Sequence, residues 1–199
     1  MLYFGMMRAA EGLGKIMRFW PVVLFLVGSH LVGSRCLNAA TPEQLSMNRL
    51  IDESTEIVRG TVVYCNYLYR APMIWTVCEV NVTDRFKGAS GAKVQVAIPG
   101  GVASGFRQTF EGSPTLDRNG EYLFFLWQGK SGLKQIMGLS QGLLTLTKDD
   151  KGSLVAARAA TEERMVGAAG QTIQDSGWSG RLADLSSRIQ SRAKGTAKR

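Results

Sequence analysis

"LDRNGEYLFFLW", residues 116–127, is the stretch of the chain on which the predicted fold depends. Its last six residues are apolar on both faces of an extended chain, which predicts a central strand buried on both sides. The Asn119-Gly120 pair before it is the strongest short-range signal for a hairpin turn. A strand of this kind needs neighbours along both edges and cover on both faces.

The neighbours are predicted from strand-like segments on either side. Residues 55–70 and 74–88 are rich in β-branched and aromatic residues and flank a turn, "RAPM" (70–73). "AKVQVAIPGG" predicts a third strand and "FRQTFEG" a short fourth. Residues 134–158 predict up to three more, with a turn at "DDKG" (149–152). Many short strands predict an all-β protein, either a small Greek-key barrel of the OB type or a compact β-sandwich.

Two helices flank this strand-rich part. "TPEQLSMNRLIDES" predicts a short N-terminal helix that Thr41 or Ser46 can cap, with Met47, Leu50 and Ile51 on one face. Leu182, Leu185 and Ile189 repeat at helical spacing and predict a peripheral C-terminal helix at 180–190. The predicted organisation is a signal peptide at 1–40, a β-barrel domain at 41–160, and a weakly structured basic tail at 161–199 that contains the short helix.

The N-terminal segment has the order of a secretory signal peptide. Arg8, Lys15 and Arg18 precede an apolar run at 19–29, and small residues follow at Ala39 and Ala40. The run is shorter than the roughly 20 residues of a membrane span. Export to the periplasm or the extracellular space is therefore predicted, and an uncleaved signal anchor is the alternative. A lipoprotein is disfavoured because Arg35, not a small residue, precedes Cys36.

The net charge of +8 is unevenly distributed. Residues 41–180 contain equal numbers of acidic and basic residues, and the excess lies in the signal segment and in the tail 181–199. Nucleic-acid binders usually carry their basic face on the folded domain, so no nucleic-acid partner is expected. Membrane contact is expected only through the signal segment or the basic tail.

The lack of histidine in the predicted mature chain limits the catalytic and metal-binding chemistry it can perform. The single histidine, His30, lies in the signal segment, so the mature chain would contain none. This excludes Ser-His-Asp and Cys-His nucleophile systems and histidine-based zinc or iron sites. We expect no cofactor and no metal, and a protein that is not an enzyme.

The two cysteines of the predicted barrel face each other if "RAPM" closes a hairpin. The residue numbers of each facing pair then add up to about 143. This places Cys65 opposite Cys78, Val63 opposite Val80 and Thr61 opposite Val82. An exported chain meets oxidising conditions. A Cys65–Cys78 disulfide is predicted, with two buried free thiols as the alternative.

The glycine-rich loop "IPGGVASGFRQTFEGSP" (98–114) resembles a ligand loop. A phosphate-binding loop usually opens a helix, whereas this one continues into a strand-like "FRQTF". The glycines therefore predict a bend between strands, and Arg107 is the candidate binding residue. Five glycines are predicted to be structural: Gly60, Gly88, Gly100, Gly101 and Gly120.

Other side chains have two interpretations each. Glu111, Asp117 and Glu121 are either paired acids for glycoside chemistry or surface and turn residues, and Glu111 and Glu121 are also weak binding candidates. Ser131 and Lys134 would be a minimal nucleophile pair. Trp75, Trp127 and Tyr67 form either an aromatic binding platform or part of the core.

The order of several motifs resembles that of a family of uncharacterised exported bacterial proteins. The motifs are "RLIDESTEIVRGTVV", "EVNVTDRFKG", "VAIPGG", "GSPTL" with "NGEYLFFLW", and "GLSQGLLTL". The same order is remotely similar to netrin-like OB-fold modules, which include the tissue inhibitors of metalloproteinases. Those inhibitors act through an N-terminal cysteine that cleavage near Ala40 would not leave here. The resemblance therefore implies the barrel and no activity.

These observations favour an exported, non-enzymatic β-barrel module that binds an unidentified protein or cell-envelope component. The alternatives are an extracytoplasmic carboxylate-dependent enzyme, using acids near Glu111–Glu121, and a signal-anchored envelope protein with a structural role.

Overall fold

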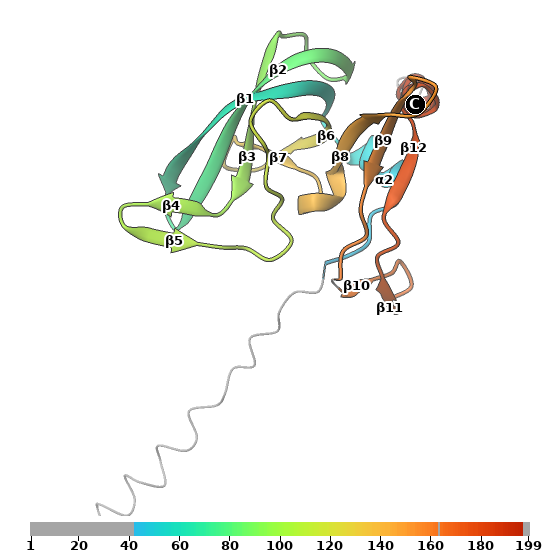
Figure 1. The fold of residues 1–199 in the computed structure, drawn as a ribbon. Helices are drawn as coiled ribbons and strands as arrows, with labels where there is room; N and C mark the ends of the chain where they lie inside the picture. Colours follow the sequence, from blue (N-terminus) through green and yellow to red (C-terminus); the bar gives the residue numbers. More distant parts are fainter. Residues whose placement is uncertain (1–41, 163, 197–199) are drawn as a thin grey trace, which may run out of the picture. The chain divides into compact units, whose positions relative to one another are not determined.

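A computed structural model describes residues 42–162 and 164–196 (Figure 1). The predicted signal segment, with His30 and Cys36, lies outside the described residues. The elements are α2 (Met47–Glu53), β1 (Glu56–Arg70), β2 (Met73–Lys87), β3 (Lys93–Pro99), β4 (Gly101–Ala103), β5 (Phe106–Gln108), β6 (Glu121–Gln128), β7 (Lys134–Ile136), the 3₁₀ helix η2 (Leu139–Gly142), β8 (Leu143–Lys148), β9 (Leu154–Arg158), β10 (Arg164–Val166), β11 (Thr172–Gln174), β12 (Trp178–Arg181) and α3 (Leu182–Thr196). None of these helices is long and apolar enough to span a membrane.

Five strands close into a ring, in the order β1-β2-β3-β7-β6 and back to β1. All neighbours in the ring are antiparallel except β3 and β7, which are parallel at Ala97 and Gln135. This is the small barrel of OB type that the sequence predicts, and the all-β class is confirmed. β8, β9 and β12 continue the sheet outward from β6.

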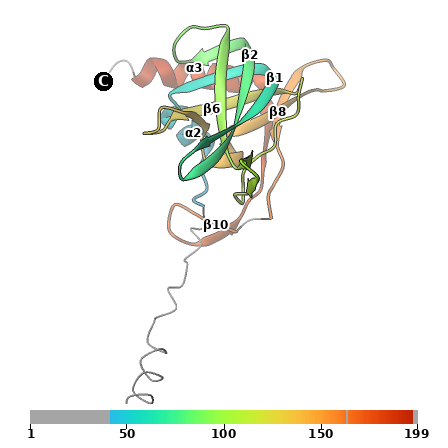
Figure 2. The same ribbon diagram turned by 90° about the vertical axis from the view of Figure 1, so that its left-hand side faces the viewer.

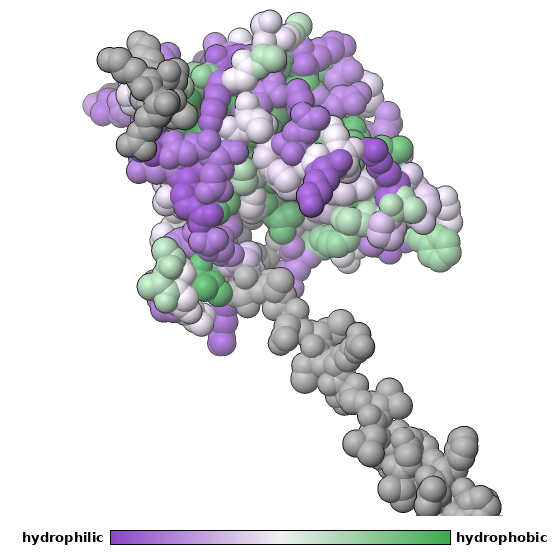
Figure 3. Space-filling model, turned by 180° about the vertical axis from the view of Figure 1, so that it is seen from behind, coloured by the Kyte–Doolittle hydropathy of each residue, from purple (hydrophilic) through white to green (hydrophobic). Residues whose placement is uncertain are grey.

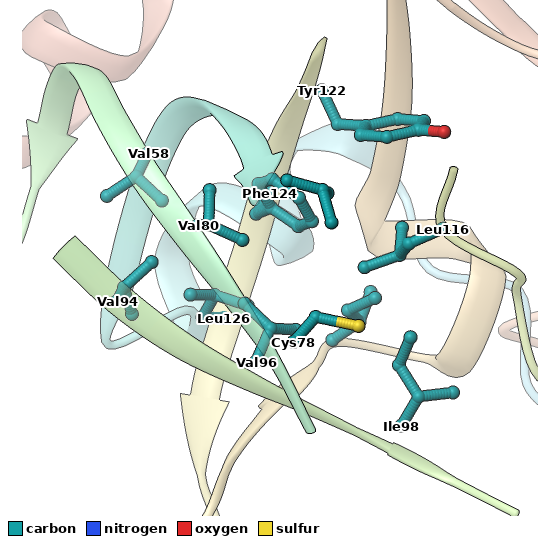
Figure 4. Packing of buried hydrophobic residues seen from close by; sticks show 12 residues of the cluster. Val58, Cys78, Val80, Val94, Val96, Ile98, Leu116, Tyr122, Phe124 and Leu126 are labelled. Atoms are coloured by element: carbon teal, nitrogen blue, oxygen red, sulfur yellow. The ribbon is translucent and has the colours of Figure 1, made fainter. Parts of the chain in front are cut away.

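The strand β6 lies at the centre of the fold, as its sequence predicts. One edge pairs with β1, and the other edge is shared by β7 and β8. Tyr122, Phe124 and Leu126 point into the barrel core (Figure 4), while Leu123 and Phe125 belong to a second core on the other face. Burial on both faces is confirmed from Tyr122 to Leu126, whereas Trp127, at the end of the predicted run, is 36% exposed.

The second core lies between the sheet and the two helices. Ser46 caps α2, accepting a hydrogen bond from the Arg49 N–H at 3.3 Å, and the predicted apolar face of this helix is buried. α3 contacts α2, β2, β9 and β12, and Figure 2 shows it behind β1 and β2. Its predicted apolar face, Leu182, Leu185 and Ile189, is buried in the same core.

The segment after residue 160 is more ordered than the predicted weakly structured tail. β12 pairs with β9, and α3 extends to Thr196. Asp175 is fully buried and binds the Arg158 guanidinium, which connects this segment to β9. The sequence gives little sign of these strands because an ion pair and backbone pairing stabilise them, rather than a periodic apolar face.

The Asn119-Gly120 turn is present, but it does not form the predicted hairpin. Asn119 has a positive φ of 65°, and β6 begins directly after the turn. The preceding strand β5 pairs with β4 and not with β6. The turn is held against β1 instead: the Val62 N–H donates to the Gly120 carbonyl at 3.0 Å, and the Asn119 N–H donates to the Val62 carbonyl at 2.8 Å.

Candidate binding site

The far end of the β1–β2 hairpin is fastened by a disulfide. β6 pairs with β1 only from Glu56 to Thr61, so the last part of β1 is paired with β2 alone. In this part Cys65 lies directly opposite Cys78, the two Cα atoms are 4.0 Å apart, and the sulfurs are bonded. The predicted disulfide is confirmed, and it fixes the register of the hairpin where the barrel no longer does.

The register nearer the barrel differs from the prediction. The sequence places Val63 opposite Val80 and Thr61 opposite Val82, and both pairs are wrong. A bulge at Val63 shifts the pairing by one residue, so that Val62 lies opposite Val80. A bulge adds an unpaired residue to one strand and bends it, and a rule based on the sum of residue numbers cannot include it.

The glycine-rich loop forms the predicted bend between strands. Gly100 and Gly101 have φ values of 106° and 143° and turn the chain from β3 into β4. A Cβ atom on Gly101 would lie 2.6 Å from the Tyr67 ring, so this position also requires a close approach. The bend brings the β4–β5 hairpin against the far end of β1 and β2 (Figure 1).

Three hydrogen bonds hold the loop to β2. The Gly100 N–H donates to the Ile74 carbonyl and the Thr76 hydroxyl donates to the Gly100 carbonyl, both at 2.8 Å. The Ile74 N–H donates to the Gln108 side-chain oxygen at 2.7 Å. These bonds position β5, and with it Arg107, beside the β1–β2 hairpin.

The other predicted structural glycines also lie at crowded or strained positions. A Cβ atom on Gly60 would lie 2.4 Å from the Asn81 carbonyl oxygen, and one on Gly120 would lie 2.6 Å from the Tyr122 ring. Gly88 has a φ of 101° and packs against Glu56.

Two hollows flank β5. One, of about 470 Å³, is lined by residues that include Tyr69, Ile74 and Phe106. The other, of about 290 Å³, extends past Tyr67 to the disulfide. Arg107 and Gln108 line both, and Arg107 is the only charged side chain among the described residues lining either hollow.

Around the hollows lies an exposed apolar surface, which we call the Arg107 surface: Tyr67, Tyr69, Val102, Phe106 and Arg107. Phe106 is 74% exposed, Tyr67 59% and Tyr69 58%. Figure 3 shows hydrophobic residues gathered at the end of the molecule that carries β4 and β5. An exposed group of large apolar side chains is typical of an interaction surface.

Arg107 itself is exposed, and its guanidinium has no partner among the residues that the structure describes. Throughout residues 42–162 and 164–196, no side chain forms an ion pair or hydrogen bond with its guanidinium. By contrast, Arg59 binds Asp84 and Glu121, and Arg158 binds Asp175.

The candidate acids do not share a hollow beside β5. Glu121 accepts a hydrogen bond from Arg59 at 2.8 Å, Asp117 accepts one from the Tyr122 hydroxyl at 3.3 Å, and Glu111 is exposed in a turn. None of the three lines a hollow beside β5. The described residues also contain no group of three His, Cys, Asp or Glu side chains that could hold a metal ion.

Lys134 is engaged by another residue than Ser131, and the aromatic trio does not share one hollow. The Lys134 ammonium lies 2.7 Å from Glu56. Trp75 is buried and Trp127 is 36% exposed. Of the three predicted aromatic residues only Tyr67 lines a hollow, so the trio does not form a platform.

The sequence interpretation did not single out Tyr69 and Phe106. A usable signal for Tyr69 existed, because residues two apart on a strand share a face, as Tyr67 and Tyr69 do. Phe106 is separated from them by the whole of β2 and β3, so only the bend at Gly100-Gly101 brings it there.

The opposite end of β1 carries a buried ionic cluster. Glu56, the first residue of β1, has a side chain only 7% exposed, and it forms ion pairs with Arg85 and Lys134. Arg85 also donates a hydrogen bond to the Gly91 carbonyl at 3.0 Å. The buried carboxylate of this cluster is therefore matched by two cations of the chain.

Comparison with protein-family models finds no matching family, and no curated protein matches the chain. The candidate site therefore rests on the geometry of its residues.

Proposed function

We propose that the chain is an exported, non-enzymatic β-barrel module that binds a protein or cell-envelope partner through the Arg107 surface. The observation that carries the proposal is the combination of three large exposed aromatic rings with an arginine that has no partner in the described chain. Aromatic residues and arginine are the types most enriched at the centres of protein interfaces.

The disulfide supports the predicted compartment. Disulfides persist in oxidising environments and are rare in the cytosol. Cys65 and Cys78 are bonded at the base of the proposed surface, so an oxidising compartment would also maintain its geometry.

The alternative of a carboxylate-dependent enzyme needs two acids facing one cavity. Glu121 and Asp117 contact Arg59 and Tyr122 instead, and neither acid lines a hollow beside β5. The binding module remains the proposal that the geometry supports best.

Site-specific photocrosslinking in the native host tests the binding function. Phe106 of the full chain is replaced by photoreactive benzoylphenylalanine, which retains an aromatic ring at the surface. The matched control carries the same group at Lys151, an exposed position in the β8–β9 turn. We expect a discrete crosslinked product from position 106 only. Equal products from both positions, or none from position 106, would overturn the proposal.

Mass spectrometry tests the export separately. Protein recovered from the envelope or the medium should begin near Thr41 and contain no thiol that reacts before reduction. Two reactive thiols, or an intact N-terminus in a cytosolic fraction, would contradict export.

A further inference from the structure

We infer that the Arg107 surface binds an extended peptide segment of a partner protein, with an acidic side chain on the Arg107 guanidinium and apolar side chains in the two flanking hollows. This inference rests on the proposed binding function and names the class of partner. Three features support it: the charge of the surface, the free edge of β5, and the position of the hollows.

The charge selects an anionic partner. Arg107 is the only charged residue among the described residues lining the two hollows, and its guanidinium holds no carboxylate of residues 42–162 or 164–196. The guanidinium is a planar fork whose N–H groups match the two oxygens of a carboxylate. A carboxylate bound beside Tyr69 and Phe106 is partly shielded from water, which strengthens the contact.

The free edge of β5 favours a partner with an extended main chain. β5 pairs with β4 only, through Gly101–Gln108, Val102–Arg107 and Ala103–Phe106. The two-residue turn Ser104-Gly105 makes Ala103–Phe106 a hydrogen-bonded pair, and such pairs alternate along an antiparallel ladder. The N–H and C=O of Arg107 therefore point away from β4.

This edge of β5 is open as far as the structure describes the chain. In the described residues no turn or loop hydrogen bond reaches the main chain of Arg107. A peptide lying along β5 can thus pair with Arg107 through its backbone while its side chain meets the guanidinium, which is the strand-addition mode of recognition.

The hollows select apolar residues on the peptide. They lie beside the same strand, one toward Tyr69 and Phe106 and the other toward Tyr67 and the disulfide, and share Arg107 and Gln108. Side chains of an extended peptide recur at regular intervals along a strand, so one peptide can reach both hollows and the guanidinium between them.

Peptide selection tests the partner class. A displayed library of random 12-residue peptides is selected on the immobilised full chain, and the most enriched peptide is synthesised with a fluorescent label. A twin peptide carries Asn or Gln in place of its acidic residue. We expect Asp or Glu to be enriched between apolar positions, and the twin to bind about tenfold or more weakly.

Variants of the chain then test whether Arg107 is the residue that binds the acidic side chain of the peptide. Arg107→Gln should weaken binding of the selected peptide about tenfold or more, and Arg107→Lys should restore part of the loss because it keeps the charge without the fork. Arg118→Gln, at an exposed arginine in the next loop, is the matched control and should leave the affinity unchanged. Raising the salt concentration should weaken wild-type binding and have little effect on Arg107→Gln.

Each other outcome overturns the inference. Selected peptides without acidic residues, no selected peptide at all, or an unchanged affinity of Arg107→Gln would reject an acidic peptide. Arg107-dependent binding of a single-stranded oligothymidylate, or of vesicles of anionic phospholipid, that is tighter than binding of the peptide would assign the surface to that ligand. A position-106 crosslink in the absence of acidic selection would leave the binding function standing and remove only the partner class.

Discussion

The two ends of β1 differ in how their charged side chains are paired and buried. At Glu56 the barrel buries a carboxylate and surrounds it with Arg85 and Lys134. At the other end, where β1 reaches Tyr67 and Tyr69, Arg107 lies among exposed aromatic rings, and no carboxylate of the described part of the chain pairs with it. A buried charge must be matched for the fold to be stable, whereas an exposed one need not be. The Glu56 end therefore contributes to stability, and the Arg107 end is the one we propose for binding.

Removing the carboxylate at the Glu56 end should have the largest effect on stability. Glu56→Gln leaves Arg85, only 14% exposed, without its anionic partner. We expect the free energy of unfolding to fall by about 3–5 kcal/mol in urea titrations, as for other broken buried ion pairs.

The matched control for this variant is Glu79→Gln on the same sheet. Its partner Lys93 is 61% exposed, so the loss of stability should be clearly smaller than that of Glu56→Gln. Equal effects of the two variants would show that the Glu56 cluster is not the stabilising feature we describe.

Reducing the disulfide should have the next largest effect. Cys65 and Cys78 are 13 residues apart, and closing a loop of this length stabilises a fold by about 2–4 kcal/mol. Thermal unfolding with and without a phosphine reductant measures the loss. Amides of β6, which exchange when the whole fold opens, should lose protection by this same amount, and amides of the far β1–β2 hairpin should lose more because they also exchange through local opening. A uniform change across both would contradict a local role.

The ion pair between Arg158 and Asp175, away from both ends of β1, makes a pH-dependent contribution to stability. The hydrogen bonds from Arg158 lower the pKa of Asp175 to about 2 from its usual 3.8. A lowered carboxyl pKa stabilises the fold above the unfolded value, and this stabilisation is lost as the pH falls through the folded value. We expect this ion pair to contribute roughly 2 kcal/mol to the free energy of unfolding at neutral pH. The contribution should be lost between about pH 5 and pH 2.

Comparison with Asp175→Asn isolates this contribution. The difference in unfolding free energy between wild type and Asp175→Asn should narrow over the same pH range. Asp150→Asn, in the exposed β8–β9 turn, should follow the wild-type profile throughout. A constant difference at all pH values would show that the pair does not titrate as described.

The sequence predicts the parts of this fold that local patterns determine. The apolar run of β6, the facing cysteines and the apolar faces of α2 and α3 each follow from the spacing of residues within one or two segments. The ionic contacts do not: Glu56 meets Lys134, and Arg158 meets Asp175, only after the sheet has formed. The Arg107 surface is only partly predictable from the sequence. The sequence singles out Arg107 and Tyr67, whereas Phe106 joins them only because the chain bends at Gly100-Gly101.

Truncating Arg107 should have the smallest effect on stability and the most specific effect on binding. The side chain is exposed and holds no group of the described chain, so Arg107→Ala should change the free energy of unfolding by no more than about 0.5 kcal/mol. Arg59→Ala is the matched comparison, because Arg59 is 19% exposed and binds Asp84 and Glu121, and it should be clearly less stable. The crosslink at position 106 should weaken with Arg107→Ala and persist with Arg59→Ala at temperatures where both variants are folded. If Arg107→Ala lost as much stability as Arg59→Ala, Arg107 would be a structural residue, and the two ends of β1 would not differ in the way proposed.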